Sequence, residues 1–255
     1  MAVSFIALPG LPEVRRGDDL SALAAAGMVA AQLAPQQGDV LVVAQKIVSK
    51  AEGRLVALSS VTPSPRAREL SMITGKDPRL VELVLRESAE VLRAKPNVLI
   101  VAHRAGFVMA NAGIDRSNVT AESGAADEDV ALLLPEDCNA SAARLRDSLR
   151  GRGFDLPVVI SDSFGRAWRN GVVNVALGAA GLPSLIDRRG EADRHGRILE
   201  VTQVAFADAI AAGAALAMGE GAEGTPMVLA RGLAWTVPEC DAQALIRPIA
   251  EDMFR

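Results

Sequence analysis

Asp162 and Ser163 are the residues of this sequence whose types and position first indicate chemistry. They follow residues 158–160, a short run of β-branched side chains that predicts a buried strand ending at the segment 161–163. A carboxylate beside a hydroxyl at the end of a buried strand suits a hard cation such as Mg²⁺ or Mn²⁺. The same residues also fit an ordinary Asx turn, and the local pattern alone favours that simpler interpretation.

A second aspartate occurs in a similar setting. Asp115 lies in the loop 111–118, which follows the apolar segment 107–110, and Gly113 permits an unusual backbone angle there. Two carboxylates brought close together repel each other by roughly a few kcal/mol at an effective dielectric constant near 20. A shared divalent cation would make the same arrangement favourable. The two loops together lead us to expect that Asp115 and Asp162 meet around a metal ion.

Several cationic side chains could contact a phosphorylated ligand. Lys46 and Lys50 are four residues apart, so they would share one face of a helix that follows the predicted strand 40–43. Two cations on one face repel unless an anion lies between them, and a triphosphate would serve, although a solvated helix face is the more ordinary explanation. Arg166 and Arg169 could likewise donate to phosphate or carboxylate oxygens, or simply be solvated.

The segment 219–224 matches the pattern GxGxxG by letter. A dinucleotide-binding fingerprint requires a strand before this pattern and a helix after it. Here the predicted order is helix 201–218, glycine loop, strand 227–230, so we reject that fingerprint. Glu220 and Glu223 could add a cation ligand on a loop whose backbone can approach a ligand closely, but a plain helix C-cap and turn explains the segment equally well. The sequence has no GxxxxGK[ST] motif, which excludes nucleotide binding of the P-loop type.

Composition excludes several classes of protein. The chain has 255 residues, half of them hydrophobic, a net charge of −4, and only 3% aromatic residues with no tyrosine. These values argue against nucleic-acid binding by a basic surface or by stacking platforms. No secretory signal or bilayer-spanning segment is visible. We therefore expect a protein that does not bind membranes. Cys138 and Cys240 form no CxxC pair, so we expect both to be reduced thiols in a cytoplasmic protein.

The remaining pattern predicts a mixture of helices and strands. Further strands are expected at residues 3–8 and 98–102, and further helices at 20–33, 66–74, 78–89 and 140–150. The segments 120–130 and 187–197 are expected to be loops. His103 and His195 share no metal-ligand spacing, so we interpret them as polar or turn residues. This order of elements predicts an α+β (mixed α/β) fold that is neither Rossmann nor P-loop.

Five motifs occur in a fixed order: GLPEVRRGDDL, VAQKIVSKAEGR, NAGIDRSNV, ISDSFGRAWRNGVVNVALG and MGEGAEGTP. Together they resemble the coenzyme F-420-0:L-glutamate (γ-glutamyl) ligase family, over Gly10 to about Gly232. The resemblance implies an enzyme that joins L-glutamate to a deazaflavin coenzyme precursor, using GTP, Mg²⁺ or Mn²⁺ at two sites, and K⁺. It also implies the family's unusual γ-glutamyl-ligase fold and a homodimer whose partners are small-molecule substrates.

The resemblance carries over specific residues. Those implied to contact GTP are Leu11, Pro12, Glu13, Val14, Gln45, Lys46, Lys50, Asn118, Met218, Gly219, Glu220, Gly221, Ala222, Glu223, Gly224 and Thr225. One metal is assigned to Asp115 and Asp162, and a second to Ser163 and Glu220. The implied mechanism transfers the γ-phosphoryl group of GTP to a carboxylate of the precursor, and the amine of glutamate then attacks the acyl phosphate. No general base for that amine is identified.

The resemblance implies a single γ-glutamyl ligase domain over residues 1–255, with room for two sub-lobes and no fused C-terminal domain. Two alternatives stay open at this point. The chain could be a non-catalytic module that binds GTP or a deazaflavin, although the five intact motifs argue against this. It could also be a ligase of the same mechanism that acts on another phosphorylated acid, which only a substrate screen would distinguish.

Overall fold

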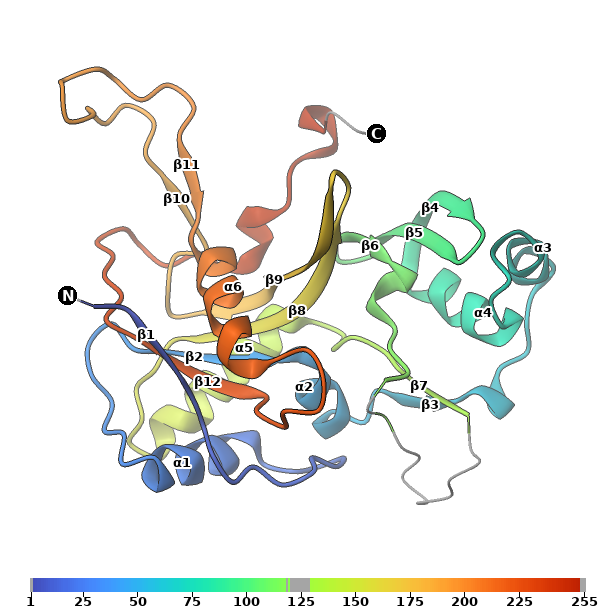
Figure 1. Ribbon diagram of the computed structural model, residues 1–255, viewed down its shortest axis with the longest axis horizontal. Helices are drawn as coiled ribbons and strands as arrows, with labels where there is room; N and C mark the ends of the chain where they lie inside the picture. Colours follow the sequence, from blue (N-terminus) through green and yellow to red (C-terminus); the bar gives the residue numbers. More distant parts are fainter. Residues whose placement is uncertain (1, 118, 120–128, 253–255) are drawn as a thin grey trace.

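A computed structural model describes residues 2–117, 119 and 129–252 of the chain. Asn118 and most of the predicted loop 120–130 therefore lie outside the described residues. Figure 1 shows a larger lobe, built on a five-stranded sheet, and a smaller lobe formed by α3, α4 and the sheet β4–β6. Each lobe has its own hydrophobic core.

The central sheet has the strand order β1-β12-β2-β8-β9. Its strands are β1 (Ser4–Ala7), β12 (Met227–Arg231), β2 (Val40–Ala44), β8 (Val158–Arg166) and β9 (Arg169–Ala180). β2 and β8 are parallel, and the other neighbours are antiparallel. Alternate residues of β2 pack into the cores on the two faces of the sheet, which explains why these strands are apolar without interruption.

Helices cover both faces of this sheet. One face packs against α1 (Leu20–Ala30), α2 (Gln45–Ala51) and α5 (Cys138–Gly151), and the other against α6 (Phe206–Met218). The Asp19 side chain caps α1 by accepting from the backbone N–H groups of Ser21 and Ala22, both at 3.0 Å. The alanine-rich α6 approaches the sheet closely, since a Cβ on Gly213 would lie 2.1 Å from the Phe5 ring.

The smaller lobe consists of α3 (Pro65–Thr74), α4 (Pro78–Glu87) and the antiparallel strands β4 (Ser88–Lys95), β5 (Val98–His103) and β6 (Val108–Ala110). The pair β3 (Leu55–Ala57) and β7 (Val130–Leu132) connects it to the larger lobe, and β10 (Leu185–Asp187) pairs with β11 (Gln203–Ala205) in a projecting arm (Figure 1). Short 3₁₀ helices occur at η1 (Leu58–Ser60), η2 (Asn111–Gly113), η3 (Ala242–Leu245) and η4 (Ile249–Glu251).

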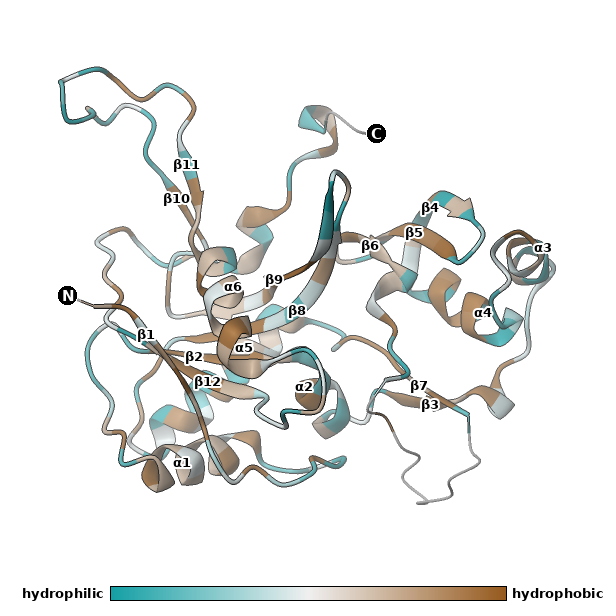
Figure 2. Cartoon of the chain, in the orientation of Figure 1, coloured by the Kyte–Doolittle hydropathy of each residue, from teal (hydrophilic) through white to brown (hydrophobic). Residues whose placement is uncertain are grey.

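The predicted α+β class is confirmed, with three local corrections. The predicted helix 201–218 is wrong over its first residues, because Gln203–Ala205 pair with β10 as strand β11 and α6 begins at Phe206. β8 does not end at Ser161: it continues to Arg166, because β9 pairs with it through Asp162 and Ser163. The outer half of this hairpin is hydrophilic (Figure 2), which is why its polar residues resemble a turn in the sequence. The predicted helix 78–89 is also too long, since α4 ends at Glu87 and the strand β4 begins at once. The tertiary pairing of β4 with β5 overrides the helical pattern there.

A close approach of β9 to the start of α5 provides a stability prediction. A Cβ on Gly178 would lie 2.1 Å from the carbonyl oxygen of Cys138, and backbone atoms cannot move away cheaply. Gly178→Ala should therefore lower the free energy of unfolding by about 1–3 kcal/mol, as overpacking does. Gly165→Ala is the matched control on the same hairpin, because no atom lies within 4 Å of its added Cβ. Equal urea midpoints for the two variants would contradict this account.

Candidate functional site

The parallel pairing of β2 and β8 brings two of the predicted segments together. Ala44 lies opposite Ser161, so both strands reach the same edge of the sheet at this point. Gln45, the first residue of α2, thereby lies near Asp162, and its side chain acts to lower the pKa of that carboxyl group. Because the carboxyl ends of parallel strands are where α/β proteins place ligands, this edge is a reasonable location for a site.

Two more predicted segments reach the same edge. The backbone N–H of Ala44 donates to the carbonyl of Pro226 at 2.9 Å, which places the end of the glycine loop next to α2. The N–H of Leu8 donates to the carbonyl of Met227 at 2.9 Å, so the chain leaves β1 toward residues 11–14 from this edge. The segments 11–14, 45–50, 162–163 and 218–225, far apart in sequence, therefore lie along one edge of one sheet.

Lys46 ties the second aspartate loop to this edge. Its Nζ forms an ion pair with Asp115 Oδ2 at 2.7 Å and donates to the carbonyl and the hydroxyl of Ser117 at 2.9 and 3.1 Å. Asp115 also accepts from the Ser117 N–H at 2.7 Å. Burial acts to raise the pKa of Asp115, but the hydrogen bonds from Lys46 and Ser117 outweigh it and hold that pKa below its ordinary value.

Asp162 has the opposite electrostatic environment. Burial, reinforced by the nearby Asp115 carboxylate, raises its pKa to about 7 against the opposing effects of the Ser163 N–H, Lys46 and Gln45. The influence of Asp115 on Asp162 means that the two carboxylates act on the same site and not on opposite surfaces of the chain. Two neighbouring carboxylates whose environments push their pKa values apart are characteristic of functional sites.

The carboxylate pair fits a divalent cation that a nucleotide also coordinates. Among the described residues no three His, Cys, Asp or Glu side chains are arranged to hold a metal by themselves. Mg²⁺ in phosphate-transfer sites uses one or two carboxylates and takes its other ligands from substrate phosphates and water. A cation between Asp162 and Asp115 would relieve the repulsion that adds to the effect of burial on the pKa of Asp162.

The residues assigned to the nucleotide differ in how far their side chains are exposed to solvent. Glu13 is exposed and forms an ion pair with the mostly buried Lys50. Leu11 is partly buried and Pro12 is exposed, whereas Val14 is buried in the core of the larger lobe. Only the backbone of Val14 could therefore reach a ligand on the open side of this edge.

The glycine loop is closed by its own hydrogen bonds. Thr225 Oγ1 donates to the carbonyl of Met218 at 2.8 Å, and the Gly221 N–H donates to Glu223 Oε2 at 2.8 Å. Gly219 has a φ of 72° and takes the loop away from α6, whose last residue Met218 is buried. The intervening residues are exposed. No hydrogen bond or ion pair among the described residues joins Glu220 to Ser163, so the assigned second metal pair is not assembled within this part of the chain.

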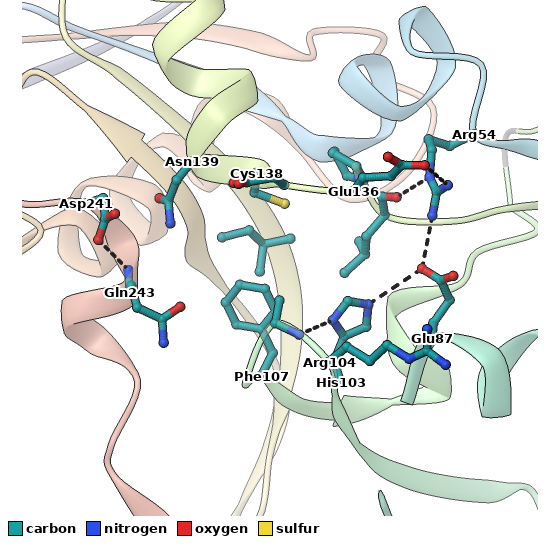
Figure 3. Close-up of a pocket in the computed structure, with 15 residues that line it drawn as sticks. Arg54, Glu87, His103, Arg104, Phe107, Glu136, Cys138, Asn139, Asp241 and Gln243 are labelled. Carbon is teal, nitrogen blue, oxygen red and sulfur yellow. Dashed lines mark hydrogen bonds and ion pairs between the residues drawn. The ribbon is translucent and has the colours of Figure 1, made fainter. Parts of the chain in front are cut away.

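A cavity of about 610 Å³ lies at the start of α5, and Figure 3 shows the residues that line it. It is close to Asp162 through Cys138, because the charge of Asp162 acts on that thiol. The Cys138 thiol lines it, and burial raises the pKa of that thiol to about 12, with further contributions from the charges of Glu52, Asp137 and Asp162. Both cysteines are free, as expected from their spacing, and this one is an unreactive neutral thiol. The sequence analysis did not identify this cavity, because its lining residues carry no local motif.

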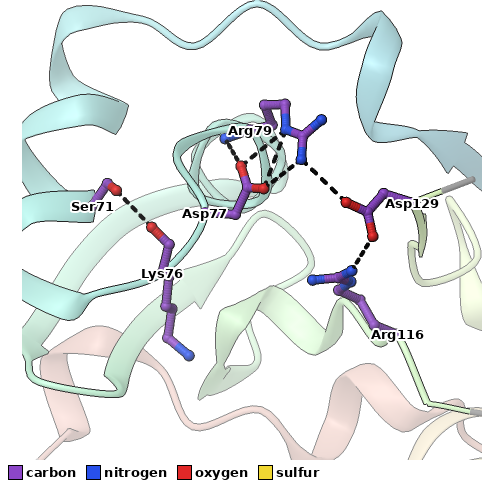
Figure 4. Close-up of polar contacts among 6 residues, drawn as sticks. All are labelled: Ser71, Lys76, Asp77, Arg79, Arg116 and Asp129. Carbon is purple, nitrogen blue, oxygen red and sulfur yellow. Dashed lines mark hydrogen bonds and ion pairs between the residues drawn. The ribbon is translucent and has the colours of Figure 1, made fainter. Parts of the chain in front are cut away.

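Ion pairs beyond Asp115 also escaped sequence analysis. Asp129 accepts from Arg116 at 2.6 Å and from Arg79 at 3.3 Å, and Arg79 pairs with Asp77 at 2.6 Å (Figure 4). This chain of charges joins the residue that follows Asp115 to the start of α4 in the smaller lobe. Only the tertiary fold brings these side chains together, so spacing could not have indicated them.

Arg166 and Arg169 lie away from the carboxylate pair within this chain. They face each other at the end of the β8–β9 hairpin, where Arg166 donates to the carbonyl of Asn170 at 2.8 Å. Four residues of extended strand, about 13 Å at 3.3 Å per residue, separate Arg166 from Asp162.

No helix in the described parts of the chain has the length and apolar content needed to cross a bilayer.

Comparisons with known proteins agree with the motifs. The model of the F420-0:gamma-glutamyl ligase family matches residues 10–232. The chain is 43% identical over 258 residues to the coenzyme F420:L-glutamate ligase of Methanothermobacter thermautotrophicus, with 100% of both chains covered. It is 46% identical to that of Methanopyrus kandleri, covering 95% of this chain and 94% of the relative, and 47% identical to that of Natronomonas pharaonis, covering 97% and 92%. The chain therefore belongs to the F420-0:gamma-glutamyl ligase family.

Proposed function

We propose that this protein is a GTP-dependent ligase that adds L-glutamate to the deazaflavin coenzyme F-420-0, giving γ-linked glutamyl tails. Membership of the family supports the ligase activity and the substrate class. The observation that carries the proposal at the level of residues is the pairing of Asp162 with Asp115 at the sheet edge, beside Lys46 and the glycine loop.

The chemistry explains why a nucleotide is needed. A carboxylate is a poor acyl donor, so it must be activated before an amine can attack it. Transfer of the γ-phosphoryl group of GTP to the carboxylate of the precursor gives an acyl phosphate and GDP. The amine of glutamate then attacks the acyl carbon and phosphate leaves. Such phosphoryl transfer depends mainly on positioning and charge neutralisation.

The residues at the sheet edge fit these tasks. Asp115 and Asp162 would hold one divalent cation. Ser163 and Glu220, which no contact joins in the described structure, would have to come together to hold a second, and both ions would supply charge neutralisation at the phosphates. Lys46 already pairs with Asp115, and Lys50 pairs with the exposed Glu13, so both lysines could turn to phosphate oxygens when a nucleotide binds. The backbone of the loop 219–224 would close around the nucleotide.

The proposal extends to the setting of the enzyme. K⁺ as an additional cofactor, a homodimeric assembly and a cytoplasmic location are included because the five motifs resemble a family with these properties. The two free cysteines are compatible with a reducing compartment.

The overall reaction can be tested directly. Incubation of the protein with F-420-0, GTP, Mn²⁺ and L-glutamate should give a product heavier by one glutamyl unit, with one GDP released per bond formed. Mass spectrometry of the coenzyme and chromatography of the nucleotide would measure both. Binding of GTP without any product at saturating metal would instead support a non-catalytic binding module, and turnover only with another phosphorylated acid would assign a different substrate.

Asp162→Asn should abolish most of this activity while leaving the fold intact. The substitution keeps the size of the side chain but removes the charge that would hold a cation, and a loss of about 10²- to 10³-fold in kcat is expected for such a charge-stabilising group. Asp155→Asn is the matched control, because Asp155 is exposed and pairs only with Arg150 at 3.1 Å. Full activity of Asp162→Asn would show that the assignment of this metal ligand is wrong.

Metal binding should depend on pH through Asp162. Its raised pKa, about 7, means that the carboxyl group is protonated in the metal-free protein below this pH and must lose its proton to coordinate a cation. The affinity for Mn²⁺, measured by electron paramagnetic resonance without nucleotide, should fall by about tenfold per pH unit below pH 7 and level off above it. An affinity that stays constant between pH 6 and pH 8 would contradict this environment for Asp162.

A further inference from the structure

The cavity that Cys138 lines has the size and walls of a site for a flat organic ligand. It measures about 610 Å³ and lies between the end of β5, the start of α5 and η3 (Figure 3). Nine of its fifteen lining residues are polar or charged, and the six apolar ones are Ala105, Phe107, Leu134, Pro135, Cys138 and Leu177. Cavities of about 300–1,000 Å³ with apolar walls and a few fixed polar groups bind drug-sized molecules. L-glutamate alone would leave most of this volume unfilled.

Asn139 supplies the first fixed polar group. Its Oδ1 accepts from two backbone N–H groups, those of Ala179 on β9 and Ala242 in η3, both at 3.0 Å. These two bonds determine which end of the amide is oxygen, so the orientation of the side chain is set by the fold. Figure 3 shows the amide nitrogen directed toward the cavity, and the described residues offer it no acceptor. Asn139 Nδ2 is therefore a hydrogen-bond donor that could donate to a ligand in the cavity.

His103 supplies a second donor on the opposite wall. Its Nδ1 accepts from the Ala105 N–H at 3.0 Å, so in the neutral ring the proton resides on Nε2. The side chain is only 6% exposed, and Nε2 has no hydrogen-bond partner in the described structure. Nε2 faces Glu87 Oε2 at 3.9 Å, an ion-pair contact drawn in Figure 3 that helps to lower the pKa of Glu87 but is longer than a hydrogen bond. A buried donor left unpaired is costly unless a ligand satisfies it.

The charges around the cavity disfavour the amino-acid substrate as its occupant. The lining carries four carboxylates, on Glu87, Glu136, Asp137 and Asp241, against two guanidinium groups, on Arg54 and Arg104. Arg54 is already committed, because it donates to Glu87, Glu136 and the carbonyl of Leu134. L-glutamate carries two carboxylates of its own, and this surface offers them little compensation.

We propose that this cavity binds the flat heteroaromatic ring of the coenzyme substrate, with Asn139 Nδ2 and His103 Nε2 donating to the carbonyl oxygens of its pyrimidinedione edge and the apolar side chains covering its faces. This inference rests on the proposed function and specifies where the deazaflavin ring of that substrate lies. The chain attached to the ring would then run past Cys138 toward Asp115 and Asp162. Asn139 and His103 determine which ring system is accepted, and they lie apart from the reacting carboxylate.

The test uses 5-deazariboflavin, which has the ring and its ribityl chain but no phosphate or acid, titrated into the full-length protein without GTP. Wild-type protein should bind it saturably. Asn139→Asp keeps an oxygen for the two backbone N–H groups but loses the donor, and it should weaken binding by about tenfold or more, as the loss of a buried hydrogen bond does. His103→Asn retains an acceptor near Nδ1 and loses the distal donor, so it should weaken binding similarly.

His103→Gln is the matched control, because its amide nitrogen reaches the position of Nε2, and its affinity should stay within about threefold of wild type. Urea midpoints and Mn²⁺–GDP affinity of each variant verify that the fold and the carboxylate pair are intact. The proposed ring site would be wrong if wild type, Asn139→Asp, His103→Asn and His103→Gln all bound 5-deazariboflavin equally well. It would also be wrong if the wild-type protein showed no saturable binding.

Steady-state kinetics with the full precursor separate this inference from the proposed function. The donor-deficient variants should raise KM for the precursor and leave KM for L-glutamate unchanged. A raised KM for L-glutamate instead would assign the cavity to the amino acid and overturn the proposal. If the wild-type protein binds the ring through Asn139 and His103 yet forms no glutamyl product, the ring site holds and the ligase assignment is wrong. If both variants ligate normally with unchanged KM values, the ligase assignment holds and the ring site is wrong.

Discussion

The pairing of β2 with β8 is the constraint on which the rest of the structure depends. It is the one parallel pair in the described central sheet, and it places Ala44 opposite Ser161. Both strands are buried on both faces, so a shift of register by one residue would reverse which core each side chain enters and would move Gln45 away from Asp162. The apolar packing of the sheet therefore fixes the position of the charged groups at its edge.

Once the backbone is fixed, the electrostatics of the edge follow from its geometry. Lys46 lies against Asp115 and keeps that carboxylate ionised, whereas Asp162 is more deeply enclosed and has its pKa raised toward neutrality. A single lysine cannot neutralise both carboxylates. When both carboxylates are ionised this edge carries a net negative charge, which is the electrostatic basis of the cation site that we propose.

Sequence analysis predicted much of the large lobe and the residues of its edge, because these depend on local patterns. The β-branched runs of β2 and β8 and the helix–loop–strand order around Gly219 could both be anticipated. The extension of β8 through Asp162 could not, since polar residues in a projecting hairpin resemble a turn until the partner strand is known. The roles that we propose for Asn139 and His103 were equally hidden, because they depend on cavity walls from distant segments and, for Asn139, on the backbone N–H groups of Ala179 and Ala242.

The same close packing that orients Asn139 also joins the two parts of the site. Gly178 allows β9 to approach the first turn of α5, and the neighbouring Ala179 N–H then reaches the Asn139 side chain. β9 is also the strand that pairs with β8 through Asp162. The donor in the cavity and the carboxylate at the sheet edge are therefore held by a single strand. Their separation is set by strand geometry rather than by a loop, which would suit the proposed substrate, whose ring and reacting acid must be positioned at the same time.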